Sequence, residues 1–239
     1  MKRFLGLTAL ALVLIALCLQ AARWQFHRYE IRHARNEIIK ENISKSINEP
    51  DLSRVTTDPS SIAWKRIEIR GHFEPTKEIL VRNRYHYENF GYGVVTLFVS
   101  DSGKRYWVDR GWVKAGKDAT TPPVTQTVTT EENRIVARVR VENIEKQVGG
   151  TLFATSQNSG SSVLERWNGS ASVATEPVYF DLISSDREGF TPTAPTELPE
   201  ISDGPHLAYT FQWILFAILI AFGWFLVVRE DRQVQSAKA

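Results

Sequence analysis

YTFQWILFAILIAFGWFLVV, residues 209–228, decides the fold, because its twenty residues carry no charge. At about 1.5 Å rise per residue, a helix of this length reaches roughly 30 Å, the thickness of a bilayer's hydrocarbon core. The core helix of a soluble protein rarely stays apolar on every side for so long. The stretch therefore predicts a transmembrane helix.

A second uncharged apolar run lies near the other end of the chain, at residues 4–22. It predicts another transmembrane helix, which leads directly into residues 23–25 (RWQ), whose tryptophan suits the headgroup level. A cleaved signal peptide is the alternative, since the basic residues Lys2 and Arg3 precede the run. The length of the run and the tryptophan after it favour the retained helix.

The basic residues around residues 209–228 predict the orientation. No Lys or Arg lies between Thr191 and Ala208, whereas three basic residues follow the run, within residues 229–239. Because positive charge favours the cytoplasmic side, residues 229–239 would form a cytoplasmic tail. Two spans then bring the N-terminus to the same side. We expect a plasma-membrane protein with both termini in the cytoplasm and residues 23–208 outside it.

Residues 23–208 predict one mostly β domain that begins with a helix. Helical spacing of apolar residues continues to about Ile47, and after Pro50 the apolar period changes to two. The expected strands are 67–71, 79–82, 92–100, 105–113, 135–141 and 178–183. Residues 155–174 are rich in Ser, Gly and Asn and predict an exposed insertion. The expected fold class is two transmembrane helices flanking an extracytoplasmic, antiparallel β-barrel-like α+β domain.

Some glycines and tryptophans have expected structural roles. Gly71 and Gly111 are expected at strand ends where a side chain would not fit. Trp64, Trp107 and Trp112 are expected to pack in the core or against the sheet rather than to contact a ligand.

Composition and motifs disfavour most enzyme classes. The formal net charge of +2 gives no indication of nucleic acid as a partner. Cys18 is the one cysteine and lies within the first apolar run, so the outer domain can have no disulfide, CxxC or thiolate metal site. The sequence contains no GxSxG, HExxH or GxGxxG motif, and its five histidines are not spaced as metal ligands. We expect a non-enzymatic protein.

His206 stands out at the start of the second apolar run. Pro205 favours a helix start, which places His206 in the first helical turn. A neutral imidazole at the bilayer surface is suited to act as an axial ligand of haem iron. Arg23 and Arg28 leave the other span at the same depth and could pair with haem propionates. The alternative is that His206 is an interfacial polar residue that only caps the span.

The chain resembles the surfeit locus protein 1 family, the assembly factors of haem–copper cytochrome c oxidase. The resemblance rests on the order of short motifs, each weak alone, across nearly the whole sequence. These motifs are WQFHR at 24–28, IRGHF at 69–73, GYGVVT at 91–96, VDRGWV at 108–113, and PHLAY at 205–209 followed by QW at 212–213. The chain departs from the family pattern at Asp109, where Asn is common, and in the Ser-rich residues 155–174.

The resemblance implies a role in maturing oxidase subunit I, with delivery or insertion of haem a. His206 matches the family's proposed haem ligand, and the implied partners are subunit I, haem a synthase and the lipid bilayer. A scaffold that binds no haem and stabilises an oxidase assembly intermediate through its β domain is the alternative.

Overall fold

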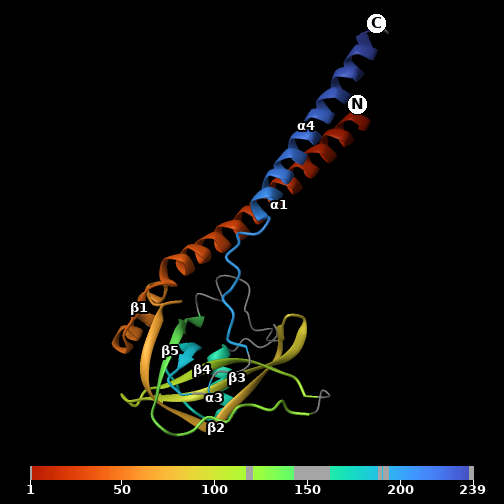
Figure 1. The fold of residues 1–239 in the computed structure, drawn as a ribbon. Helices are drawn as coiled ribbons and strands as arrows, with labels where there is room; N and C mark the ends of the chain where they lie inside the picture. Colours follow the sequence, from red (N-terminus) through yellow and green to blue (C-terminus); the bar gives the residue numbers. More distant parts are fainter. Residues whose placement is uncertain (1, 117–120, 143–161, 188–189, 191–193, 237–239) are drawn as a thin grey trace. The chain divides into compact units, whose positions relative to one another are not determined.

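The computed structural model describes residues 2–116, 121–142, 162–187, 190 and 194–236. The chain folds into two compact units. One is formed by residues 1–36 with 202–239, and the other by residues 37–201. The first is a helical pair and the second a β-barrel, so the expected fold class is confirmed (Figure 1).

The helical pair consists of α1, Lys2–Asn42, and α4, His206–Ser236, which run side by side in opposite directions (Figure 1). Both helices are long and apolar enough to cross a membrane, and only 11% of each apolar window is buried. A core helix of a soluble protein would be mostly buried, so this exposure disfavours that interpretation. Trp224 Nε1 donates a hydrogen bond to Thr8 Oγ1 at 3.1 Å and links the N-terminal part of the first apolar run to the C-terminal part of the second.

The C-terminal end of α1 belongs to the barrel unit and stops earlier than expected. The helix ends at Asn42, whose side-chain amide donates to the carbonyls of Ser60 and Ala63. Ile47, which continues the isoleucine stripe, lies instead in the short strand β1, Ser46–Ile47. Two 3₁₀ helices follow, η1 (Glu49–Thr56) and η2 (Pro59–Ser61).

Five strands close the barrel, in the order β2-β3-β4-β6-β5 with β5 returning to β2. Their bounds are β2 Arg66–His86, β3 Asn89–Ser100, β4 Arg105–Lys114, β5 Asn133–Arg140 and β6 Tyr179–Ser185. All pairings in the barrel are antiparallel except β4–β6, which is parallel. A closed barrel of five strands cannot alternate in direction all the way round, so one pairing must be parallel. β1 pairs in parallel with β2.

The two strands expected at 67–71 and 79–82 are one strand, β2, which continues through Gly71. Its pairing with β3 shifts register between Glu74 and Glu78, and Pro75 lies within this irregular part. A Cβ on Gly71 would lie 2.0 Å from the carbonyl oxygen of Val99, so the expectation that no side chain fits there is confirmed, although Gly71 lies within the strand and not at its end.

The barrel interior is closely packed with apolar and aromatic side chains. Phe73 packs edge-to-face on Phe98 at 5.1 Å between ring centroids, and Tyr106 stacks on Phe180 at 4.7 Å. The packing role expected of Trp64 and Trp107 is confirmed, since both are buried.

Part of the expected insertion at 155–174 is a helix, α3, Val163–Ala171, so the exposed-insertion prediction is wrong there. Ser162 and Glu165 form a capping box at its start. Trp167 is buried against the outer face of the sheet, 5.4 Å from the ring of Tyr179. Residues 155–161 lie outside the described residues.

Candidate functional site

The sharp bend before α4 brings His206 to the first residue of that helix. Gly204 has φ +66°, a conformation that favours glycine, and Pro205 follows it. The carbonyl of Pro205 accepts from the N–H of Tyr209 at 3.0 Å, so the first helical turn closes directly after the bend. Thr210 Oγ1 donates to the His206 carbonyl at 2.9 Å. The imidazole is thereby held at the polar end of an apolar helix, as expected.

Gln25 of α1 orients the His206 ring. Nδ1 of His206 lies 2.9 Å from Oε1 of Gln25. An amide oxygen can only accept a hydrogen bond, so Nδ1 carries the proton and Nε2 presents its lone pair. Within the described residues, Nε2 of His206 has no hydrogen-bond partner. A ring oriented through one nitrogen and open at the other has the arrangement of a metal-ligating histidine.

Asp203 ties the bend to α1 beyond this pair. Its Oδ1 accepts from the buried Asn36 amide at 2.7 Å, and its Oδ2 lies 3.0 Å from His33 Nδ1. Asn36 and Gln25 occupy the same side of α1, eleven residues apart, which is about three helical turns. These two contacts of Asp203 with Asn36 and His33, called here the Asp203 clamp, therefore set the register in which Gln25 meets His206.

The arginines of the WQFHR region lie on different sides of α1. Arg28 and Arg32 are half-buried on the side that carries Gln25. Arg23 instead lines a shallow hollow with Gln20, Trp24, Phe26, His27 and Glu30. The structure thus separates the two arginines that the sequence grouped as propionate partners.

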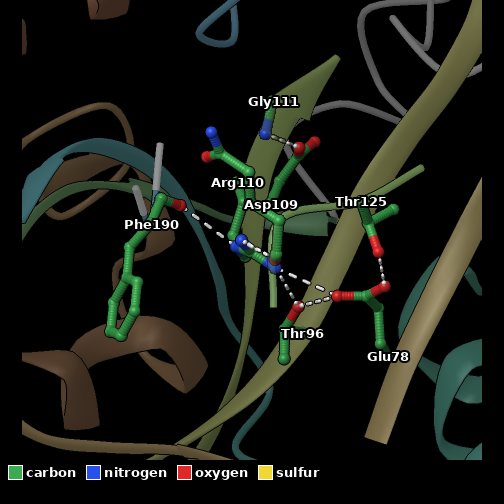
Figure 2. A network of polar contacts seen from close by, with 8 residues as sticks. Glu78, Thr96, Asp109, Arg110, Gly111, Thr125 and Phe190 are labelled. Atoms are coloured by element: carbon green, nitrogen blue, oxygen red, sulfur yellow. Dashed lines mark hydrogen bonds and ion pairs between the residues drawn. The ribbon is translucent and has the colours of Figure 1, made fainter. Parts of the chain in front are cut away.

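A second polar cluster, the Arg110 network, lies in the barrel (Figure 2). The buried Arg110 guanidinium donates to Glu78 Oε2 at 3.0 Å, to the Phe190 carbonyl at 3.1 Å and to the Gln126 carbonyl at 2.7 Å. Thr125 Oγ1 donates to the other oxygen of Glu78 at 2.9 Å. Burial lowers the pKa of Arg110, and the Glu78 charge opposes that shift. Its position tying two loops to the sheet indicates a structural role.

The neighbouring Asp109 completes the VDRGWV motif. Its carboxylate forms an ion pair with Arg84 and accepts from the N–H of Gly111 at 2.9 Å. Burial favours the neutral form of Arg84, but the charge and hydrogen bonds of Asp109 together with the charge of Asp181 outweigh this effect, so the pKa of Arg84 is raised. Gly111 has φ +122°, which favours glycine, and Trp112 bonds the Arg84 carbonyl through Nε1 at 3.2 Å. The aspartate that departs from the family pattern is therefore neutralised by Arg84.

Comparison with known proteins places this geometry in a family. The model of the SURF1 family matches residues 12–218, which include Gln25, His206 and the whole barrel. The chain belongs to the SURF1 family. Uncharacterized SURF1-like proteins of Mycobacterium bovis and of two strains of Mycobacterium tuberculosis are similar to it. Each is 29% identical over 236 residues, covering 91% of this chain and 82% of the relative.

Two residues of the candidate site around His206 have no role assigned from the sequence. Gln25 belongs to the WQFHR motif, but its partner His206 lies 181 residues away. Asp203 lies in the proline-rich stretch before the second apolar run, where no pattern points to a partner. Among the described residues, no three His, Cys, Asp or Glu side chains converge as a metal site.

Proposed function

We propose that this protein is a membrane-bound assembly factor for haem–copper cytochrome c oxidase that assists haem a delivery or insertion into subunit I. The hydrogen bond between Gln25 and His206 is the observation that carries this proposal. It orients an imidazole with a free Nε2 lone pair at the polar end of an apolar helix. Haem a is the cargo, and His206 is the side chain that would hold its iron.

The surroundings of His206 suit such a cargo. Haem a is a flat, largely apolar molecule with a long isoprenoid tail and two carboxylates. Exposed apolar side chains such as Tyr209 and Phe211 follow His206 along α4 and offer the tail a lipid-facing path. Both helices would span the plasma membrane, with both termini in the cytoplasm and the barrel outside. Haem a synthase would supply the cargo and subunit I would receive it.

Absorbance spectroscopy of the purified full-length protein tests the proposal. We expect detergent-solubilised protein incubated with haem a to show a shifted Soret band, and His206→Ala to lose it. His27→Ala is the matched control and should keep the band. His27 is exposed on α1, the helix that carries Gln25, but it points to another side of that helix. Equal Soret shifts in the wild type and in His206→Ala would contradict the assignment of the ligand.

The alternative function, a scaffold without haem, is favoured by one feature of the barrel. The tip of the β2–β3 hairpin exposes aromatic side chains, with Tyr85 68% and Tyr87 82% accessible. Exposed tyrosines are typical of surfaces that bind proteins. Under this alternative, Tyr85→Ser with Tyr87→Ser should abolish co-purification with subunit I, and His206→Ala should leave co-purification unchanged. Loss of co-purification in His206→Ala alone would count against the scaffold.

A further inference from the structure

We infer that Arg28 and Arg32, and not Arg23, form an anion-binding pair beside His206 that takes the two carboxylates of the cargo. The inference rests on the proposed function, since the carboxylates belong to the molecule whose iron His206 would hold. It concerns the α1 face that carries Gln25, Arg28, Arg32 and Asn36, called here the Gln25 face.

The bend before α4 brings Arg32 and His206 around one point. A Cβ placed on Gly204 would lie 2.8 Å from Arg32 Nη1 and 3.6 Å from His206 Cδ2. The guanidinium therefore sits in the space that glycine leaves open, next to the imidazole. Since Gly204 also has φ +66°, any larger residue there would both strain the bend and displace Arg32.

Arg28 joins Arg32 through helix geometry. Residues 25, 28 and 32 recur at three and four positions, so their side chains share the Gln25 face of α1. The positive charges of both arginines act on the His206 ring. The open imidazole nitrogen of His206 on α4 and the two guanidinium groups of α1 thus lie beside the same stretch of α1.

Among the residues that the structure describes, the two arginines lack the carboxylate partner that Arg84, Arg110 and Arg140 have. In the described part of the chain, neither Arg28 nor Arg32 forms an ion pair, whereas Arg84, Arg110 and Arg140 each pair with a carboxylate. Two like charges four residues apart on a helix destabilise one another. A bound dianion would relieve this repulsion, and guanidinium groups bind carboxylates through paired, charge-assisted hydrogen bonds.

Arg23 does not belong to this pair. It lies five residues before Arg28, on the side of α1 where Trp24 and His27 line the separate hollow. A ligand whose iron is bound at His206 would have to reach around the helix to contact Arg23. Arg23 therefore serves as a control that has the same charge at nearly the same depth.

Two sources could supply the anion, the carboxylates of an iron porphyrin or the phosphate of a lipid headgroup. Their shared chemistry is an oxyanion that accepts from guanidinium groups. The carboxylates are favoured because a single molecule can then satisfy both the imidazole nitrogen and the two arginines. Esterifying the carboxylates removes their charge and leaves the porphyrin ring and its iron in place, which separates the two sources.

The test uses the full-length protein in nanodiscs of neutral phosphatidylcholine, titrated with haemin or with its dimethyl ester and followed by the Soret band. We expect Arg28→Gln with Arg32→Gln to weaken haemin binding by roughly tenfold or more. The dimethyl ester should bind the wild type and the double variant equally. Arg23→Gln should match the wild type, and Arg28→Lys with Arg32→Lys should recover part of the loss, because the charge remains without the fork.

Several outcomes would overturn the inference. If haemin bound the double variant as tightly as the wild type, or if Arg23→Gln lost as much affinity, the arginine assignment would be wrong while His206 could still hold iron. If the ester bound the wild type as well as haemin does, and phosphatidylglycerol competed only in the wild type, the site would hold lipid phosphate. If the wild type gave no Soret change with either compound, the proposed function would fail together with the inference.

Discussion

Arginines in the two units of the molecule have opposite environments. In the barrel, Arg110 is buried and donates to two backbone carbonyls, a carboxylate and the hydroxyl of Thr96. In the helical pair, Arg28 and Arg32 are half-buried and lack a carboxylate partner within the described residues. A guanidinium whose hydrogen bonds are all made within the protein stabilises one conformation, whereas one left without a counter-ion remains available to a ligand.

The contrast indicates that the barrel and the helical pair respond differently to mutation. Polar substitutions in the barrel should lower the free energy of unfolding, because they leave buried groups without partners. Polar substitutions on the Gln25 face should change ligand binding with little effect on folding. Each experiment below tests one side of this division.

The largest loss is expected from Gly71→Glu in the barrel. A side chain at this position would overlap the backbone of Val99 and Ser100, which other strands hold in place. We expect a loss of more than about 4 kcal/mol in the free energy of unfolding, enough to prevent accumulation of folded barrel. Gly169→Ala in α3 is the matched control, because no atom lies within 4 Å of its Cβ position. Tryptophan fluorescence during urea unfolding measures both, and a native-like transition in Gly71→Glu would contradict this packing.

Arg110→Leu should follow, with a loss of about 3–5 kcal/mol, because the half-buried Glu78 carboxylate would lose its cation and the carbonyls of Gln126 and Phe190 would lose their donor. Arg134→Leu is the control, since its ion pair with Glu68 at 3.1 Å is exposed and should be worth less than about 1 kcal/mol. The same urea unfolding measures both variants. If the two losses were equal, the Arg110 network would not be the stabilising feature that its burial indicates.

Asp109 separates the effect of charge from the effect of shape. Asp109→Asn keeps an oxygen for the Gly111 N–H and should cost about 1–2 kcal/mol through the weakened contact with Arg84. Asp109→Ala removes both acceptors and should cost about 3 kcal/mol or more. Thermal unfolding ranks the two variants. A larger loss for Asn than for Ala would show that Arg84 does not depend on this oxygen.

Much of the fold could be predicted because its signals are local. The uncharged run at 209–228 and the alternation around 135–141 each decide their own element. Pro75 and the polar residues beside it interrupt the alternation, so β2 looked like two strands although pairing with β3 continues across the irregularity. For α3, the Ser- and Gly-rich composition favours the prediction of a loop, although the capping box of Ser162 and Glu165 indicates the start of a helix.

The site could be predicted only in part because its contacts are distant in sequence. His206 was found from its place at the start of an apolar helix, which is a local property. The role of Gln25 depends on the register of α1 against α4, which the Asp203 clamp sets and which no local pattern encodes. The separation of Arg23 and Arg28 around α1 follows from their five-residue spacing, but which of these sides meets His206 depends on the same register.

The smallest effect is expected at the hydrogen bond that joins Trp224 to Thr8 in the helical pair. Thr8→Val keeps the shape of the side chain and removes the oxygen that accepts from Trp224. Such bonds between membrane helices contribute about 0.6 kcal/mol on average, so helix association should weaken by that order. Energy transfer between dyes on the two helices of the full-length protein, in mixed micelles, measures the change, with the exposed Leu12→Val as control. A loss above about 2 kcal/mol would show that the helical pair, like the barrel, depends on individual polar contacts, and the division between the two units would fail.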